Sequence, residues 1–99
     1  MPEHYDPITP GEVLQMEYLE PLRISQNQLA RDIDVPVSRV ASIIKGSRAI
    51  TADTALRFGQ YFGTSPDMWL RLQSQYDLRL AQRTSWPKIK NRIRRHEAA

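Results

Sequence analysis

Between residues 25 and 46, apolar side chains recur at helical spacing in two short runs, with a break of a few residues between them. Positions i, i+1, i+3 and i+4 lie on one side of an α-helix, so each run predicts a short helix with one buried face. The buried positions are Leu29, Ala30 and Ile33 in the first run and Val40, Ile43 and Ile44 in the second. The sequence therefore predicts two short helices joined by a tight turn.

Residues that favour helix ends flank both runs. Ser25 is a good N-cap, and Gln28 stands where a capping box expects glutamate or glutamine. Asp34 and Pro36 are expected to end the first helix, because a residue before proline is pushed out of the α region and aspartate tolerates turn conformations. Gly46 is a typical C-terminal stop for the second helix. Helices of about eight residues are unstable alone, so other elements must cover their buried faces.

The same signals predict three more helices. Their spans are Pro10 to about Leu19, residues 52–62, and Pro66 to about Leu80, with Thr9, Thr51 and Ser65 as N-caps. Pro21 is expected to end the first of them and Gly63 the second. The helix over residues 52–62 should bury Ala55, Leu56, Phe58, Gly59 and Phe62. No segment shows sustained strand alternation, so we expect an all-α fold of five helices.

The last predicted helix carries an aromatic stripe at helical spacing, formed by Trp69, Leu72 and Tyr76. Such a stripe is more often core than ligand site. We therefore expect it to contribute to the core and to a dimer seam, and not to a cofactor pocket.

Charge divides the chain unevenly. Residues 1–38 have a net charge of −5 and residues 39–99 a net charge of +8. A basic half that begins at the second short helix is typical of a nucleic-acid contact, although surplus charge also aids solubility. The chain has no cysteine and no run of eighteen apolar residues, and its first residues lack the pattern of a signal peptide. These features predict a cytoplasmic protein without a membrane segment.

The chain ends differ from the middle. Residues 1–8 show no periodicity and are expected to be flexible, and residues 9–81 form the predicted domain. Residues 82–99 contain six basic residues before their single acid, Glu97. This segment is interpreted either as a disordered tail or as a short basic helix.

Catalytic and metal sites find little support. His4 and His96 lie at opposite ends of the chain, and the four glycines are scattered over turns and helix ends. Neither arrangement fits a metal site, an activated nucleophile or a phosphate loop. We therefore expect no enzyme, no metal and no cofactor.

The second short helix has the side chains that base reading requires. Its exposed positions Val37, Ser38, Arg39 and Ser42 can touch a thymine methyl group or bond to base edges in the major groove. Gln26, Lys45 and Arg48 are placed to hold the phosphate backbone. The pair is thus interpreted as a DNA-binding helix-turn-helix. A competing interpretation takes these residues as ordinary solvated faces of a helical protein-interaction module.

Several longer segments resemble one family. The entry at Thr9-Pro10-Gly11-Glu12 and the segments ITADTALR (50–57), YFGTSP (61–66) and WLRLQSQYDL (69–78) are similar to the HigA antitoxins of the xenobiotic-response-element (XRE) helix-turn-helix family. The resemblance implies a λ-repressor-like domain with a short basic C-terminal extension.

It also implies a bacterial protein that dimerises, represses its own operon and neutralises a HigB-type toxin, an mRNA-cleaving endonuclease. The resemblance implies that Val37, Ser38, Arg39 and Ser42 form the reading face. It also implies that Gln26 contacts the backbone and the operator edge and that Lys45 contacts phosphate. A stand-alone XRE repressor without a toxin remains the alternative. This chain departs from the family pattern at Asp34, where relatives commonly have glycine. An aspartate is therefore expected to adopt a left-handed conformation at this turn position.

Overall fold

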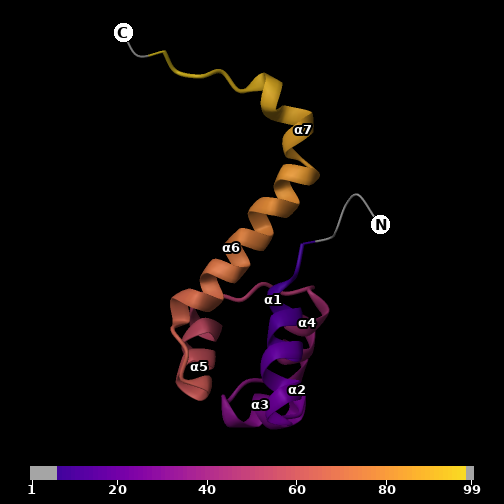
Figure 1. The fold of residues 1–99 in the computed structure, drawn as a ribbon, viewed down its shortest axis with the longest axis vertical. Coiled ribbons are helices and arrows are strands. Elements are labelled where there is room, and N and C mark those ends of the chain that lie inside the picture. Colours follow the sequence, from indigo (N-terminus) through magenta and orange to yellow (C-terminus); the bar gives the residue numbers. More distant parts are fainter. Residues whose placement is uncertain (1–6, 98–99) are drawn as a thin grey trace.

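The computed structural model describes residues 7–97, and in this range all regular secondary structure is helical and no strand is present. The elements in order are α1 (Pro10–Val13), η1 (Leu14–Leu19), α2 (Glu20–Leu22), α3 (Gln26–Asp32), α4 (Val37–Lys45), α5 (Ala52–Phe62), α6 (Pro66–Arg83), α7 (Trp86–Ile89) and η2 (Lys90–Arg92) (Figure 1). Most of the segment predicted to be flexible, together with His4, falls in residues 1–6, outside the described residues.

The first three elements follow one another without a break, so the described residues form six helices and not the predicted five. The sixth is the short helix α7–η2, which lies within the C-terminal segment 82–99. Residues 86–92 of that segment are helical in the structure.

The prediction that Pro21 ends the first helix was wrong. The middle of this helix widens into the π-helical turn η1, in which the N–H of Glu20 donates to the carbonyl of Gln15, five residues back. A proline lacks an N–H and crowds the carbonyl of the preceding turn, and a wider turn leaves it room. The helix ends instead at Leu22 and is capped by Arg23, which has a left-handed φ of 56°. The N–H of Ile24 then closes the end on the carbonyl of Leu19 at 2.9 Å.

The four predicted N-caps and the two predicted glycine stops are confirmed. The hydroxyl groups of Thr9, Ser25, Thr51 and Ser65 each accept from a backbone N–H in the first turn of the following helix, at 3.0, 3.0, 3.4 and 3.2 Å. Gly46 and Gly63 follow α4 and α5 with φ angles of 85° and 75°. These local signals fix where four helices begin and where two end.

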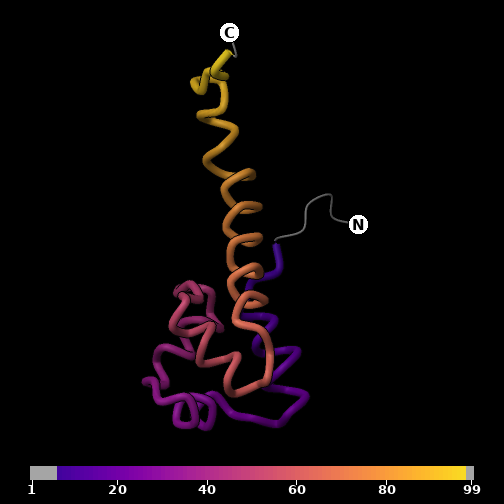
Figure 2. Tube along the Cα trace, turned by 90° about the vertical axis from the view of Figure 1, so that its left-hand side faces the viewer, coloured from indigo at the N-terminus to yellow at the C-terminus, as the bar shows by residue number. Residues whose placement is uncertain are grey.

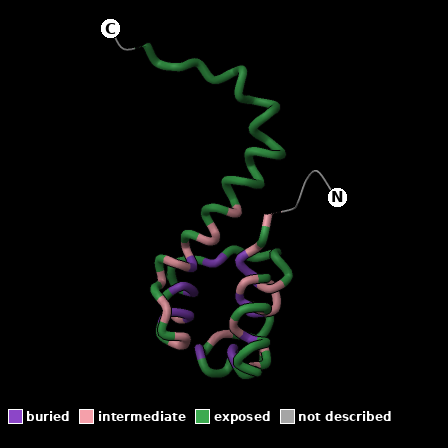
Figure 3. The backbone as a smooth tube through the Cα atoms, viewed as in Figure 1, coloured by how far each residue is buried: buried purple, intermediate pink, exposed green. Residues whose placement is uncertain are grey.

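The core lies between the first helix, the α3–α4 pair, α5 and the start of α6. Its largest fully buried side chains are Trp69 and Phe58, whose ring centroids are 5.0 Å apart, and Tyr18 packs against Trp69 at the same distance. The indole N–H of Trp69 donates to the Thr64 hydroxyl at 2.9 Å, so this large side chain is buried with its polar atom satisfied. Figure 3 shows the buried residues gathered in this part of the molecule.

One predicted core position is exposed. Leu56 on α5 keeps 62% of its surface accessible, whereas its neighbour Ala55 is fully buried. Leu56 lies next to the buried stripe, and spacing alone does not show how wide a stripe the neighbouring helices cover.

Helix α6 begins in the core and continues beyond it. Trp69 is buried and Leu72 and Tyr76 are half-buried, but all described residues from Asp77 to Glu97 are exposed. Figure 2 shows the outer part of α6 and the C-terminal segment projecting from the bundle. This projection gives the molecule its longest dimension of 54 Å.

Gly11 allows the first helix to touch α4. A Cβ atom at Gly11 would collide with the backbone carbonyl oxygen of Ile43 and lie 2.8 Å from the Cα of Ile44. Because both atoms belong to the α4 backbone, a rotamer change cannot relieve the contact. Gly11 therefore sets the distance between the first helix and α4.

Replacing Gly11 with alanine should lower the free energy of unfolding by about 1–3 kcal/mol through overpacking. Helix propensity alone would favour alanine by about 1 kcal/mol. The sign of the measured change in unfolding free energy therefore shows whether overpacking or helix propensity dominates. Urea unfolding measures it, with Asn27→Ala at an exposed position of α3 as the control. A gain in stability would contradict the close approach.

Candidate nucleic-acid interface

The turn between α3 and α4 is built around Asp34, which has a φ of 60°. This left-handed conformation is costly for most residues, although aspartate tolerates it better than most. The N–H of Val35 donates to the carbonyl of Ala30 at 3.0 Å and closes the end of α3. The sequence-based expectation that a carboxylate residue occupies a left-handed position here is confirmed.

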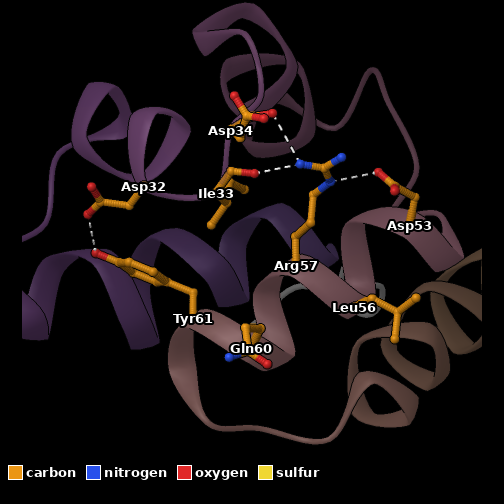
Figure 4. Close-up of a pocket in the computed structure, with 8 residues that line it drawn as sticks. All are labelled: Asp32, Ile33, Asp34, Asp53, Leu56, Arg57, Gln60 and Tyr61. Carbon is orange, nitrogen blue, oxygen red and sulfur yellow. Dashed lines mark hydrogen bonds and ion pairs between the residues drawn. The ribbon is translucent and has the colours of Figure 1, made fainter.

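Arg57 of α5 holds this turn from outside. Its Nη1 donates to the carbonyl oxygens of Ile33 and Asp34, at 2.6 and 3.1 Å, and its Nε donates to Oδ2 of Asp53 at 2.9 Å (Figure 4). Carbonyl groups at a helix C-terminus have no partner within their own helix. One guanidinium therefore satisfies the end of α3 and ties the turn to α5.

Tyr61, one turn further along α5, makes a second tie. Its hydroxyl donates to Oδ2 of Asp32 at 2.9 Å, at the end of α3. Partial burial raises the pKa of Tyr61 above its usual value, and the hydrogen bond to Asp32 and the charge of that carboxylate raise it further. Arg57 and Tyr61 together fix α3 against α5.

Helix α4 presents its polar side outward. Val40 and Ile43 are buried beneath it, whereas Ser38 is exposed and Val37 keeps 44% of its surface accessible. Ser42 is half-buried, and its carbonyl accepts from the N–H groups of Ser47 and Arg48 at 3.0 and 3.2 Å. These contacts fold the loop after α4 back on the helix end.

Arg39 differs from the other predicted reading residues because it already has an ionic partner. Its Nη1 lies 3.7 Å from Oδ2 of Asp53, and its side chain is 31% exposed. The Nε atom of Arg39 is buried and has no hydrogen-bond partner among the described residues. Arg39 therefore lies along the junction of α4 and α5 with part of its guanidinium still accessible.

The predicted backbone-contact residues lie at helix ends. Gln26 is half-buried at the first position of α3, Lys45 is exposed at the last position of α4, and Arg48 is exposed in the loop beyond. The far end of this loop is anchored by α6, where Oε1 of Gln73 accepts from the N–H of Ile50 at 2.8 Å. The loop that carries Arg48 is thus held at both ends.

Trp69, Leu72 and Tyr76 do not form one continuous buried seam. Trp69 is core, and Leu72 packs at the edge of the core. Tyr76 lines a shallow hollow with Gly11 and Arg48. The core part of the prediction is confirmed for Trp69, and the dimer seam stays a prediction.

Sequence reasoning missed Arg57, Asp53 and Gln73 as residues that position the interface. The i, i+4 spacing of Asp53 and Arg57 was visible as an acid–base pair on a helix. The bonds from Arg57 to the α3–α4 turn join residues more than twenty positions apart. Local sequence spacing does not predict such contacts.

Comparison with known proteins agrees with this geometry. A helix-turn-helix family model matches residues 16–69, which include α3, α4 and α5. The chain belongs to the XRE-type helix-turn-helix family, in the group that contains the HigA antitoxins. It is a DNA-binding regulator by family and not an enzyme.

Three relatives illustrate the similarity. Virulence-associated protein I of Dichelobacter nodosus is 47% identical over 75 residues, which cover 76% of this chain and 69% of the relative. A HigA-family antidote protein of an addiction module from Coxiella burnetii is 43% identical with a TM-score of 0.86, over 93% of this chain and all of that one. The Pseudomonas aeruginosa antitoxin HigA, solved with the higBA promoter, is 41% identical with a TM-score of 0.85, over 89% and 96% of the two chains.

Membrane-spanning helices and metal-binding clusters are both absent from residues 7–97. No helix there is both long and apolar enough to cross a membrane. No group of three or more histidine, cysteine, aspartate or glutamate residues is arranged to hold a metal ion in the same range.

Replacing Arg57 with alanine should lower the free energy of unfolding by about 2–3 kcal/mol, because charged hydrogen bonds to the turn are lost. Arg57→Lys should recover only part of this, since one ammonium cannot reproduce the planar fork. Urea unfolding of both variants measures the loss, and Arg71→Ala on the exposed side of α6 is the control. Equal losses of unfolding free energy at Arg57 and Arg71 would contradict a stabilising role of the bonds from Arg57 to the turn.

The bond between Tyr61 and Asp32 should make stability depend on pH in the alkaline range. The folded state raises the pKa of Tyr61 from 10.0, so its contribution is present below that pH and is lost as the pH rises through the folded pKa. The free-energy difference between the wild type and Tyr61→Phe should therefore shrink above about pH 10. Urea unfolding from pH 7 upward measures it, and a constant difference would contradict the bond.

Proposed function

We propose that this protein is a dimeric antitoxin that represses its own operon and neutralises a HigB-type mRNA-cleaving toxin in the bacterial cytoplasm. Val37, Ser38, Arg39 and Ser42 read base edges in the major groove. Gln26, Lys45 and Arg48 hold the phosphate backbone on either side. Two copies bind the two halves of an operator about one turn of DNA apart (~34 Å).

The observation that carries the proposal is the presentation of α4. Its apolar side is buried on the bundle, and its N-terminal polar side faces outward from a turn that Arg57 holds in place. A related antitoxin of the same group, from Pseudomonas aeruginosa, was solved with promoter DNA. The orientation of α4 and this relationship support operator binding.

A dimer agrees with the surface of α6. Leu72 and Tyr76 remain partly accessible next to the bundle, and Leu78 further along keeps 60% of its surface exposed. Two-fold pairing would present two α4 helices to one face of the duplex, as palindromic half-sites require.

Loss of base contacts should change sequence preference. Ser38→Ala and Arg39→Ala should each reduce discrimination against a substituted operator by about 1–3 kcal/mol. Lys45→Ala should weaken all sequences alike and reduce the slope of log affinity against log salt by about one unit. Gel-shift titrations over a range of salt concentrations measure both effects. Equal losses on every sequence for all three variants would refute the assignment of roles.

The toxin partner can be tested by co-purification with the product of the adjacent gene. Stable capture of that product, with loss of its mRNA-cleaving activity, is the expected result. Operator binding without capture would favour a stand-alone repressor. Capture without any promoter binding would favour a protein-interaction module.

A further inference from the structure

Asp53 links Arg57, which holds the α3–α4 turn, to Arg39 on the predicted reading face. Its Oδ2 accepts from Nε of Arg57 at 2.9 Å and lies 3.7 Å from Nη1 of Arg39. The same Arg57 is held by the carbonyl groups of Ile33 and Asp34. Figure 4 shows Arg57 between Asp53 and the turn. Asp53 is 60% exposed, yet its position is fixed by an arginine that the turn itself immobilises.

Arg39 is restrained on one side and open on the other. Its Nε is buried without a partner among the described residues, and Asp53 attracts its Nη1. The side chain lines a hollow of about 340 Å³ at the start of α5, together with Arg48 and Thr51. An arginine held in one orientation loses less conformational freedom when it forms a bidentate contact.

An anion next to a DNA-reading surface has two opposite effects. It repels phosphate groups whatever the base sequence, because the duplex carries a dense negative charge. It also keeps a neighbouring arginine from swinging to the nearest phosphate, where the arginine would add affinity without specificity. A carboxylate in this place should therefore lower affinity for all DNA and raise the preference for the correct site.

We propose that Asp53 is a specificity-determining positioning residue that orients Arg39 towards a base edge. This inference rests on the proposed reading role of Arg39. Asp53 itself needs no contact with DNA.

A purely structural role predicts something else. Asp53 lies in the first turn of α5 and pairs with Arg57 at i, i+4, so it stabilises the helix through the helix dipole and an ion pair. That role alone would change stability and leave base preference untouched. Base preference is therefore the measurement that separates the two roles.

The test compares Asp53→Asn with Asp67→Asn. Asp67 lies in the first turn of α6, so its replacement makes the same charge change at an equivalent helix position. Affinities are measured for the operator, for unrelated DNA, and for an operator substituted at the base pair where Arg39→Ala loses discrimination. Titrations are repeated at several salt concentrations, and urea unfolding shows that each variant is folded under the assay conditions.

Asp53→Asn should bind unrelated DNA more tightly than Asp67→Asn does, and its preference for the operator should fall at least about fivefold, the lower end of what one bidentate contact supplies. In the Arg39→Ala background the same substitution should cause no further fall in preference. A misfolded variant cannot produce this result, because unfolding weakens binding to every DNA.

The proposal is overturned if the operator preference of Asp53→Asn equals that of Asp67→Asn, or if the fall persists without Arg39. Failure of the proposed function would look different. The wild type would then show no preference for the operator over unrelated DNA, before any variant is compared.

Discussion

The Arg57 guanidinium occupies a position on which both motif helices depend. The turn between α3 and α4 leaves carbonyl groups without partners inside their own helix, and Arg57 supplies donors to two of them. Helices of seven and nine residues are too short to be stable by themselves. Their mutual angle is thus held by buried side chains below and by this arginine beside the turn.

The packing beneath the motif explains how α4 is held in place. Gly11 brings the first helix into contact with the α4 backbone, and Val40 and Ile43 are buried on the same side. The aromatic side chains of Phe58 and Trp69 connect α5 to α6. Gln73 of α6 then holds the loop beyond α4. The base reading proposed for α4 needs side chains fixed to within a fraction of an ångström, and these contacts would meet that need with few residues.

The net charge of the chain does not show how acidic and basic side chains are arranged around the motif. The acidic first half of the chain contributes Asp32 and Asp34 to a groove on the side of the motif. There the Tyr61 hydroxyl donates to the Asp32 carboxylate, and Arg57 donates to the backbone carbonyl of Asp34. The basic second half supplies Arg39, Lys45 and Arg48 beside α4. Asp53 stands at the border between the two regions, next to Arg39. In the proposed complex with DNA, an acid in this place would oppose indiscriminate attraction to phosphate.

Local chemistry in the sequence determined where many of the helices begin and end and which of their faces are buried. Caps at Thr9, Ser25, Thr51 and Ser65 and stops at Gly46 and Gly63 depend on neighbours a few residues away, so they were predictable. The apolar stripes of α3 and α4 were predictable for the same reason.

Only the tertiary structure decided the rest. Pro21 continues a helix because a π-helical turn makes room for it, and Leu56 is exposed because no neighbouring helix covers it. The link from Arg57 to the turn and from Asp53 to Arg39 joins residues distant in sequence. Such contacts depend on how whole helices pack, and helical spacing along one segment carries no information about that packing.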